Sequence, residues 1–276
     1  MLLQRILTAI PLAALASWLI FFQSSEVLFY AFLVVTFIAG WEWSRLSGMA
    51  QPMLRGLYAL VITLSTWALD TLNLTNPLVI KIVLGLSVVW WIYVLYRMST
   101  RSPAAASDQL APFKVVIGFV TLIPAVLALK HIHAQADGSV WLFYIISIIW
   151  VADIGAYFTG KRFGRTKLAP LVSPGKTREG LYGAVLATSL YSIAAAVYFE
   201  LQIIQTVMLL IIAFFATLLS VIGDLFISVL KRERGVKDSG SILPGHGGVL
   251  DRIDSITSSA PFFVVLLDWL VLHVGL

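Results

Sequence analysis

The sequence contains no cysteine and few charged residues. Cysteine is absent from all 276 positions, which excludes disulfide bonds, thiolate metal ligands and catalysis by a thiol group. Charged residues make up only 12% of the chain, against roughly 25% in an ordinary soluble domain, whereas hydrophobic residues make up 59%. A soluble globular domain is therefore excluded, and the lipid bilayer must be the main solvent of this chain.

Long apolar runs extend along the whole sequence, and each is close to the ~20 residues that a membrane-spanning helix needs. The nine runs cover residues 7–22, 26–41, 57–72, 79–96, 115–129, 140–158, 181–199, 203–230 and 260–276. We therefore predict an all-α, polytopic integral membrane protein with about nine transmembrane helices. About five of them fall in an N-terminal region, residues 1–135, and the others in a C-terminal catalytic region, residues 136–276.

The first apolar run contains Ala14-Leu15-Ala16, a pattern that is also found at signal-peptide cleavage sites. Because the run continues apolar to Phe22, we expect a retained transmembrane helix instead.

Positive charge is concentrated in alternate loops. If all nine runs cross the membrane, 17 of the 19 lysine and arginine residues lie on one side, and only Lys81 and Lys130 lie on the other. Positively charged loops face the cytoplasm, so we predict a cytoplasmic N-terminus and cytoplasmic loops at residues 159–180 and 231–254. The compact length favours a bacterial inner membrane. Although the net charge is +5, we expect no nucleic-acid partner, because the positive charge is located in particular loops.

The loop at residues 159–180 is basic, rich in glycine and rich in hydroxyl groups. Glycines let backbone N–H groups approach an anion, lysines add charge, and hydroxyl groups donate hydrogen bonds. We therefore predict that Ser173, Lys176 and Thr177 bind phosphate groups. The alternative is that the six cations of this loop only set the topology and contact anionic lipid headgroups. Gly175-Lys176-Thr177 ends like a P-loop, but the preceding strand and the full glycine spacing are absent.

A carboxylate lies inside the eighth apolar run. If this helix continues to Arg232, then Asp224, Ser228 and Lys231 share one of its faces. A charged aspartate in a membrane span costs ~2.5–3.5 kcal/mol on insertion scales, so Asp224 needs a partner. A metal ion or Lys231 would serve, and the simpler alternative is a structural Asp–Lys pair.

Asp251 and Asp254 are three residues apart at the expected start of the last helix. This spacing places both carboxylates on one side, near the positive end of the helix dipole. Together with Asp224 they could hold one or two Mg²⁺ ions, because hard divalent cations that act on phosphates are held by carboxylates and substrate oxygens. The alternative is helix capping combined with a surface pair between Asp254 and Arg252.

Residues 244–248 form a glycine-rich turn whose backbone donors could surround a phosphate group. His246 could ligate a metal ion, contact phosphate or only hold this turn, and we favour phosphate binding or holding the turn. Nearby cations suit the negative charge of a leaving pyrophosphate. They are Lys231, Arg232, Lys237 and Arg252.

Several other polar and aromatic residues have simpler interpretations. We expect His131 and His133 to be solvated in a loop on the opposite side, and Asp268 to lie at the far membrane interface. Tryptophans near the ends of the runs are expected to be anchors at the membrane interface. These are Trp41, Trp43, Trp90, Trp91 and Trp141.

Residues 228–254 resemble the signature of the phosphatidate cytidylyltransferases, also called CDP-diacylglycerol synthases. The matching positions are Ser228, Leu230, Lys231, Arg232, Lys237, Asp238, Gly240, Leu243, Pro244, His246, Gly247, Gly248, Val249, Asp251, Arg252, Ile253 and Asp254. The stretch from Asp153 to Gly180 also resembles this family, with Arg178 where the family has tryptophan, which puts a stacking role at that position in doubt. The first 140 residues resemble it only as hydrophobic helices.

The resemblance implies a helical membrane enzyme that converts CTP and phosphatidic acid into CDP-diacylglycerol and pyrophosphate. It implies Mg²⁺ held by Asp224 and Asp251 with Asp254 nearby, and K⁺ as a candidate accompanying ion. We assign catalytic roles to Asp224, Lys231 and Asp251. The expected substrate-binding residues are Ser173, Lys176, Thr177, Ser228, Arg232, Lys237, Asp238, His246, Gly247, Gly248 and Arg252.

The ionised phosphate of phosphatidic acid can itself attack the α-phosphorus of CTP, so no covalent enzyme intermediate is required. Two other functions remain open at this point. A CTP-dependent lipid kinase would release CDP, and a transporter of anionic lipids or metabolites would move its cargo without consuming CTP. The expected partners are CTP, phosphatidic acid and the lipid bilayer, with a homodimer as the candidate assembly.

Overall fold

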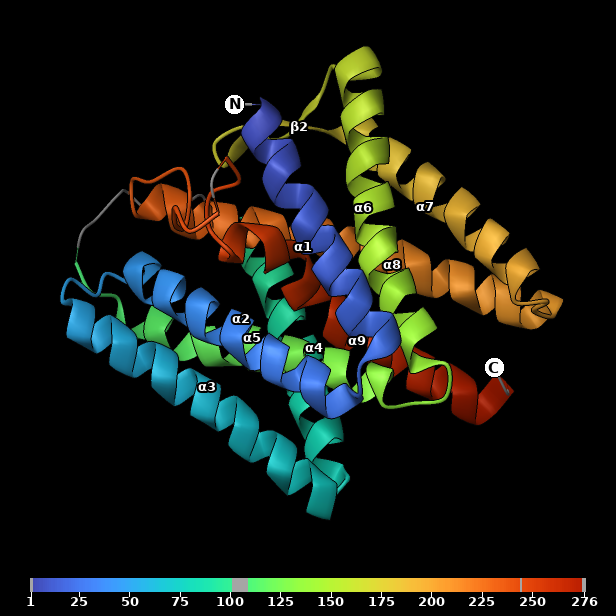
Figure 1. Cartoon of the computed structure of the whole chain (residues 1–276). Helices are drawn as coiled ribbons and strands as arrows, with labels where there is room; N and C mark the ends of the chain where they lie inside the picture. The colour runs from blue at the N-terminus through green and yellow to red at the C-terminus, as the bar shows by residue number, and fades with distance from the viewer. Residues whose placement is uncertain (1, 101–108, 244, 275–276) are drawn as a thin grey trace.

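The computed structural model describes the backbone of residues 2–100, 109–243 and 245–274 (Figure 1). Nine helices make up most of this part of the chain. They are α1 (Leu2–Phe22), α2 (Ser25–Leu46), α3 (Pro52–Thr75), α4 (Leu78–Thr100), α5 (Pro112–His133), α6 (Gly138–Phe163), α7 (Arg178–Tyr198), α8 (Ile203–Glu233) and α9 (Leu250–Val274). By length and composition, α2 to α9 can each cross a membrane, and α1 contributes a shorter apolar stretch, Ile10–Phe22. The prediction of an all-α, polytopic membrane protein is confirmed.

Helix boundaries follow local sequence signals. Helices α3 and α5 begin at Pro52 and Pro112, where a missing N–H group costs nothing because the first turn has no partner for it. The hydroxyl oxygen of Ser24 caps α2 by accepting a hydrogen bond from Val27 N, and Thr177 caps α7 through Gly180 N. Helix α8 continues through Arg232 to Glu233, as predicted.

Helices α5 and α9 form the centre of the assembly. Helix α5 packs against α2, α3, α4, α6 and α9, and α9 also packs against α8 and α4. As a result, 72% of the residues in the apolar stretch of α5 are buried inside the protein, and 61% of those in the apolar stretch of α9. Helix pairs α2–α3 and α6–α7 lie side by side toward the outside (Figure 1).

Contacts between connections that are distant in sequence define two ends of the molecule. At one end, Ala111 N donates to Ser47 O, and Lys114 of α5 pairs with Glu233 of α8 at 3.1 Å. At the other end, Lys130 pairs with Asp70 and Glu26 at 2.5 and 2.8 Å. The predicted alternation of the loops is therefore reproduced by the packing.

The expectation that His131 and His133 are solvated is wrong. His133 is buried and contacts Ile20 O at 2.8 Å and Ser25 Oγ at 2.9 Å. His131 contacts Asp268 Oδ2 at 3.0 Å, so Asp268 does lie at this end of the helices. These rings link α1, α2, α5 and α9, and the side chain of His131 stays 26% exposed.

Two tryptophans expected to be interface anchors are core residues. Trp43 is 0% and Trp91 2% exposed. Their indole N–H groups donate to backbone oxygens, Trp43 to Lys114 O at 2.7 Å and Trp91 to Thr257 O at 3.1 Å. Because the indole donor is satisfied inside the protein, each ring can be buried completely.

A small β-hairpin, which the sequence analysis did not predict, lies between α6 and α7. Strands β1 (Lys167–Ala169) and β2 (Ser173–Thr177) are antiparallel, with Lys167 opposite Thr177 and Ala169 opposite Ser173. Since α6 extends to Phe163 and α7 starts at Arg178, the predicted loop at 159–180 is largely helix ends and hairpin. The hairpin gives its basic residues defined positions next to α8.

Candidate active site

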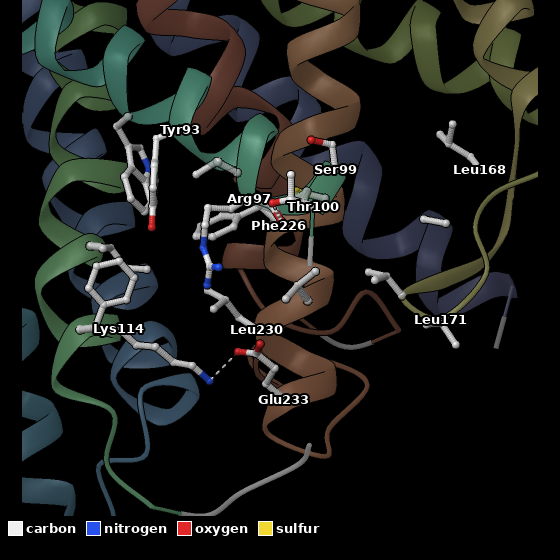
Figure 2. A pocket seen from close by; sticks show the side chains of 18 of the residues that line it. Tyr93, Arg97, Ser99, Thr100, Lys114, Leu168, Leu171, Phe226, Leu230 and Glu233 are labelled. Carbon is white, nitrogen blue, oxygen red and sulfur yellow. Dashed lines mark hydrogen bonds and ion pairs between the residues drawn. The ribbon is translucent and has the colours of Figure 1, made fainter. Parts of the chain in front are cut away.

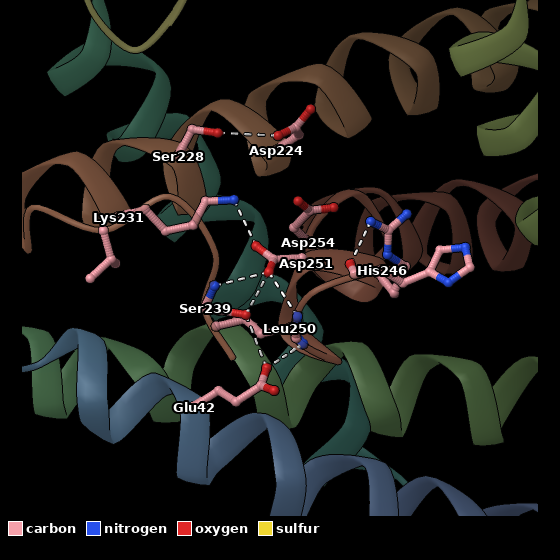
Figure 3. A network of polar contacts seen from close by, with 12 residues as sticks. Glu42, Asp224, Ser228, Lys231, Ser239, His246, Leu250, Asp251 and Asp254 are labelled. Carbon is pink, nitrogen blue, oxygen red and sulfur yellow. Dashed lines mark hydrogen bonds and ion pairs between the residues drawn. The ribbon is translucent and has the colours of Figure 1, made fainter. Parts of the chain in front are cut away.

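Helices α8 and α9 pack together and bring three aspartates to one region, Asp224 from α8 and Asp251 and Asp254 from α9 (Figure 3). On α8, Ser228 Oγ donates to Asp224 Oδ1 at 3.3 Å. The predicted common face of Asp224, Ser228 and Lys231 is therefore formed.

The lysine that pairs with Asp224 is not Lys231. Lys176 Nζ, from strand β2, lies 2.5 Å from Asp224 Oδ2, whereas Lys231 Nζ donates to Asp251 Oδ1 at 2.7 Å. The hairpin carries Lys176 to α8, and the packing of α8 on α9 places Asp251 within reach of Lys231. The predicted pair within one helix is replaced by two pairs between elements.

Asp251 accepts hydrogen bonds from three parts of the chain. Besides Lys231, its donors are Ser239 N and Ser239 Oγ, both at 2.9 Å, and Gly248 N at 3.0 Å. The side chain of Asp251 is only 8% exposed. Bonds to an ionised carboxylate are stronger than neutral ones, so this carboxylate fixes the loop between α8 and α9.

Asp254 is buried, and the described residues supply its carboxylate with one hydrogen bond, from Ser255 N at 2.7 Å. The charges that act on it are those of Asp224, Lys231 and Lys176. The alternative of a surface pair with Arg252 is wrong, because Arg252 Nη2 donates to His246 O at 2.8 Å. A buried carboxylate beside another carboxylate favours a cation between them.

A cavity of about 200 Å³ lies beside these groups, between α6, α7 and strand β2. Lys176 and Thr177 line it, together with Asp153 and Tyr157 of α6. Asp153 interacts electrostatically with Lys176, Asp224 and Arg252. Asp153 belongs to the stretch that resembles the family but had no predicted role, although it is a second carboxylate within an apolar run.

The residues of the hairpin have partly structural roles. The Thr177 hydroxyl accepts from Gly180 N at 3.1 Å, which leaves its O–H free to donate. Glu179 accepts from the N–H groups of Arg165 and Thr166 at 3.1–3.2 Å and so holds the start of the hairpin. Arg178 is exposed at the first position of α7. Ser173 lies half-buried in β2.

The loop between α8 and α9 is folded on itself. Arg232 donates to Val172 O and Val236 O, both at 3.2 Å, and so ties the loop to the hairpin. Leu243 and Gly247 form an isolated bridge, and Gly247 has φ +84°, which glycine adopts without strain. Pro244 lies outside the described residues. Lys237 and Asp238 are exposed just before Ser239.

Glu42 of α2 is a site residue that sequence analysis missed. It is 2% exposed, and its carboxylate accepts from Val249 N at 3.1 Å and Leu250 N at 2.8 Å, while Ser239 Oγ, whose single O–H group also faces Asp251, lies 3.0 Å away (Figure 3). It therefore caps the start of α9, where backbone N–H groups lack partners. The sequence does indicate a buried carboxylate here, because Glu42 directly follows an apolar run and lies between two tryptophans.

The chemistry of Asp224, Asp251 and Asp254 suits a hard divalent cation. Among the described residues, no group of three or more His, Cys, Asp or Glu side chains converges closely enough to hold a metal ion. In this conformation Lys176 and Lys231 neutralise two of the three carboxylates. The assignment of these aspartates to Mg²⁺ therefore stays a prediction.

Comparison with known proteins gives the family. The profile of the cytidylyltransferase family matches residues 3–270. The chain belongs to the cytidylyltransferase family. Proteins named phosphatidate cytidylyltransferase are similar over almost their whole length: that of Pseudomonas aeruginosa is 37% identical, with 97% of each chain covered, and that of Haemophilus influenzae 36% identical, with 95% of this chain and 97% of the relative covered. That of Thermotoga maritima is 31% identical, with 93% of each covered.

Membership of this family extends the resemblance seen in residues 153–254 to all the helices. The first 140 residues, which had no specific motif, are matched as part of the same unit. Glu42 lies in this N-terminal part and contacts Ser239 in the signature region, so the two parts form one site.

Proposed function

We propose that this chain is a phosphatidate cytidylyltransferase, which converts CTP and phosphatidic acid into CDP-diacylglycerol and pyrophosphate. The similarity to relatives of that name over almost the full chain carries the proposal. The site adds support, since Asp153 and Asp224 inside two apolar helices meet Asp251 and Asp254 at the start of a third, together with several cations. Such a position suits an enzyme that joins a water-soluble nucleotide to a lipid.

In the proposed reaction a phosphate oxygen of phosphatidic acid attacks the α-phosphorus of CTP. The new P–O bond forms as the bond between the α-phosphorus and the bridging oxygen to the β-phosphate breaks, and this oxygen leaves on pyrophosphate. The lipid supplies an ionised nucleophile, so no side chain must act as the nucleophile. The protein's task is to position the two phosphates and to balance their charge.

The cations of the site are suited to that task. Lys176 lies on the hairpin and Lys231 on α8, and each holds its ammonium group beside an aspartate. We assign Lys176, with Thr177, to the triphosphate of CTP, and Lys231 to the charge that develops on pyrophosphate. Mg²⁺ bound by Asp224, Asp251 and Asp254 would supply further positive charge to the phosphate oxygens, and K⁺ is the proposed accompanying ion.

The proposed orientation places the hairpin and the loop between α8 and α9 at the cytoplasmic face of a bacterial inner membrane. The concentration of lysine and arginine at that end supports it. A cytoplasmic site would have direct access to CTP, while the acyl chains of phosphatidic acid stay in the bilayer.

The identity of the released nucleotide fragment tests this function. Purified protein in detergent is incubated with CTP, phosphatidic acid and Mg²⁺, and the water-soluble products are separated. The proposal predicts pyrophosphate. CDP would indicate a lipid kinase, and unconsumed CTP with lipid or metabolite flux in vesicles would indicate a transporter; either result overturns the proposal.

A further inference from the structure

A second, larger cavity lies on the opposite side of α8 from Asp224. It has a volume of about 460 Å³ and is enclosed by α4, the start of α5, α8 and the turn of the hairpin (Figure 2). Its α8 residues are Phe226, Val229, Leu230 and Glu233. At ~100° per residue these fall on the helix face opposite to the one that carries Asp224, Ser228 and Lys231.

The wall of this cavity is mainly apolar. Side chains from four elements contribute to it: Trp90, Val94, Phe113, Ile117, Leu171 and Phe226. Leu168 of β1 lines both this cavity and the smaller one beside Asp153, so the two adjoin at the hairpin. A wall of this kind suits hydrocarbon and gives little to hold a free, fully hydrated ion.

Two hydrogen-bond donors on this wall have no partner. Among the described residues, three buried side-chain nitrogen or oxygen atoms lack a hydrogen-bond partner, and two of them, Trp90 Nε1 and Arg97 Nη1, belong to residues that line this cavity. In Figure 2 the Arg97 guanidinium points into the space between Lys114 and Leu230. A buried donor without an acceptor is costly, above all within a membrane span, so an acceptor ligand is favoured here.

The charge of the cavity favours an anion. Lys114 and Glu233 form an ion pair at 3.1 Å on its rim and cancel each other. Within the described residues, Arg97 forms no ion pair, so its guanidinium adds one net positive charge. Basic pockets between helix ends at the cytoplasmic side of membrane proteins are typical sites for lipid phosphates.

We propose that this cavity binds a phospholipid, whose phosphate oxygens accept hydrogen bonds from Arg97 and Trp90 while its acyl chains lie against the apolar wall. The position near the last turn of α4 places Arg97 where a headgroup phosphate meets the hydrocarbon region. The site is separate from the aspartates that we assign to nucleotide chemistry, and it goes beyond the proposed function because no step of that reaction uses it.

Photocrosslinking tests the location of the site. Full-length protein in detergent, without CTP or Mg²⁺, is mixed with phosphatidylglycerol that carries a photoreactive acyl chain, a phospholipid that is not the proposed substrate. The modified peptides are identified by mass spectrometry. We expect crosslinks in residues 90–98 and 226–233, and crosslinks confined to other surfaces would overturn the proposal.

Affinity for the same lipid, measured by native mass spectrometry, tests the donors. Arg97→Gln should weaken binding about tenfold, since a hydrogen bond to a charged group is lost, and Trp90→Phe by a smaller factor. Lys81→Gln removes a charge from the other end of the same helix and should leave binding unchanged. Equal affinity of the wild type and Arg97→Gln would overturn the proposal.

Glycerol 3-phosphate distinguishes a lipid from a free phosphate. It carries the phosphate without the acyl chains and should not compete with phosphatidylglycerol at equal concentration. Full competition would show a site for soluble phosphate and would contradict the lipid assignment. These measurements record binding only, so their failure is distinguishable from a failure of the proposed enzymatic activity.

Discussion

Glu42 and Asp251 share one hydroxyl group. Ser239 Oγ lies 3.0 Å from Glu42 Oε2 and 2.9 Å from Asp251 Oδ2, and the two carboxylates also bind successive backbone N–H groups at the start of α9. Helix α2 therefore holds the start of α9, which carries Asp251, although α2 contributes no residue to the family signature. This contact explains how the N-terminal helices can affect the chemistry of the C-terminal region.

We predict that Glu42→Gln lowers kcat at least about tenfold, because its amide NH₂ group would face donors that now meet a carboxylate, and a buried donor left unpaired costs ~1–3 kcal/mol. Thermal unfolding in detergent should show reduced stability as well. The control is Glu26→Gln, at the other end of α2. Lys130, which pairs with Glu26, still has Asp70 as an ion-pair partner in this variant. A kcat equal to that of the wild type would mean that Glu42 does not position Asp251.

Gly248→Ala should also inactivate the enzyme. A Cβ atom at this position would overlap the side chains of Ser239 and Glu42, so the turn that donates Gly248 N to Asp251 cannot keep its shape. We expect a lower unfolding temperature and loss of most activity. Gly85→Ala on α4 is the matched control, because no atom lies within 4 Å of its added Cβ. Similar behaviour of the two variants would contradict this account of the turn.

Lys176→Gln should raise the KM for CTP about tenfold, since a charge-assisted contact to the triphosphate would be lost, and should change the KM for phosphatidic acid less. Steady-state kinetics with each substrate varied in turn checks this. Lys161→Gln, which removes an exposed charge from the end of α6, is the control. If Lys176→Gln affected only phosphatidic acid, the hairpin would bind the lipid and not the nucleotide.

Much of the architecture could be predicted from sequence. The apolar runs predicted nine helices. Asp224 could be recognised as a candidate site residue because the free-energy cost of a charge within a membrane span can be read from the neighbouring sequence alone. The ion-pair partner of Asp224 could not be predicted in the same way. Lys231 lies seven residues from Asp224 on one helix, yet Lys176 takes that place, because the hairpin β1–β2 brings it there.

Other features depend on contacts between distant segments. Burial of Trp43 and Trp91 requires carbonyl oxygens of Lys114 and Thr257, which no pattern within α2 or α4 reveals. The role of Glu42 likewise depends on the docking of α2 against the start of α9. For Glu42 the rule already applied to Asp224, that a carboxylate among apolar residues needs a partner, would have been sufficient.

Lys231→Met should lower turnover strongly, because it removes the ion pair at 2.7 Å with Asp251. Removing one partner of a buried pair leaves the other uncompensated, which typically costs ~3–5 kcal/mol. The double variant Lys231→Met/Asp251→Asn tests this coupling in an unfolding assay. Its destabilisation should be smaller than the sum of the two single effects, and strict additivity would contradict a direct interaction.

The most direct test of the central claim is transfer of label from CTP to lipid by wild-type protein and by Asp251→Asn. CTP labelled on its α-phosphate is incubated with phosphatidic acid and Mg²⁺ or EDTA, and label is followed into the organic phase. We predict label in lipid with the wild type and Mg²⁺, none with EDTA, and a rate at least about 100-fold lower for a folded Asp251→Asn protein. No label in lipid with folded wild-type protein, or a wild-type rate with Asp251→Asn, would contradict the account.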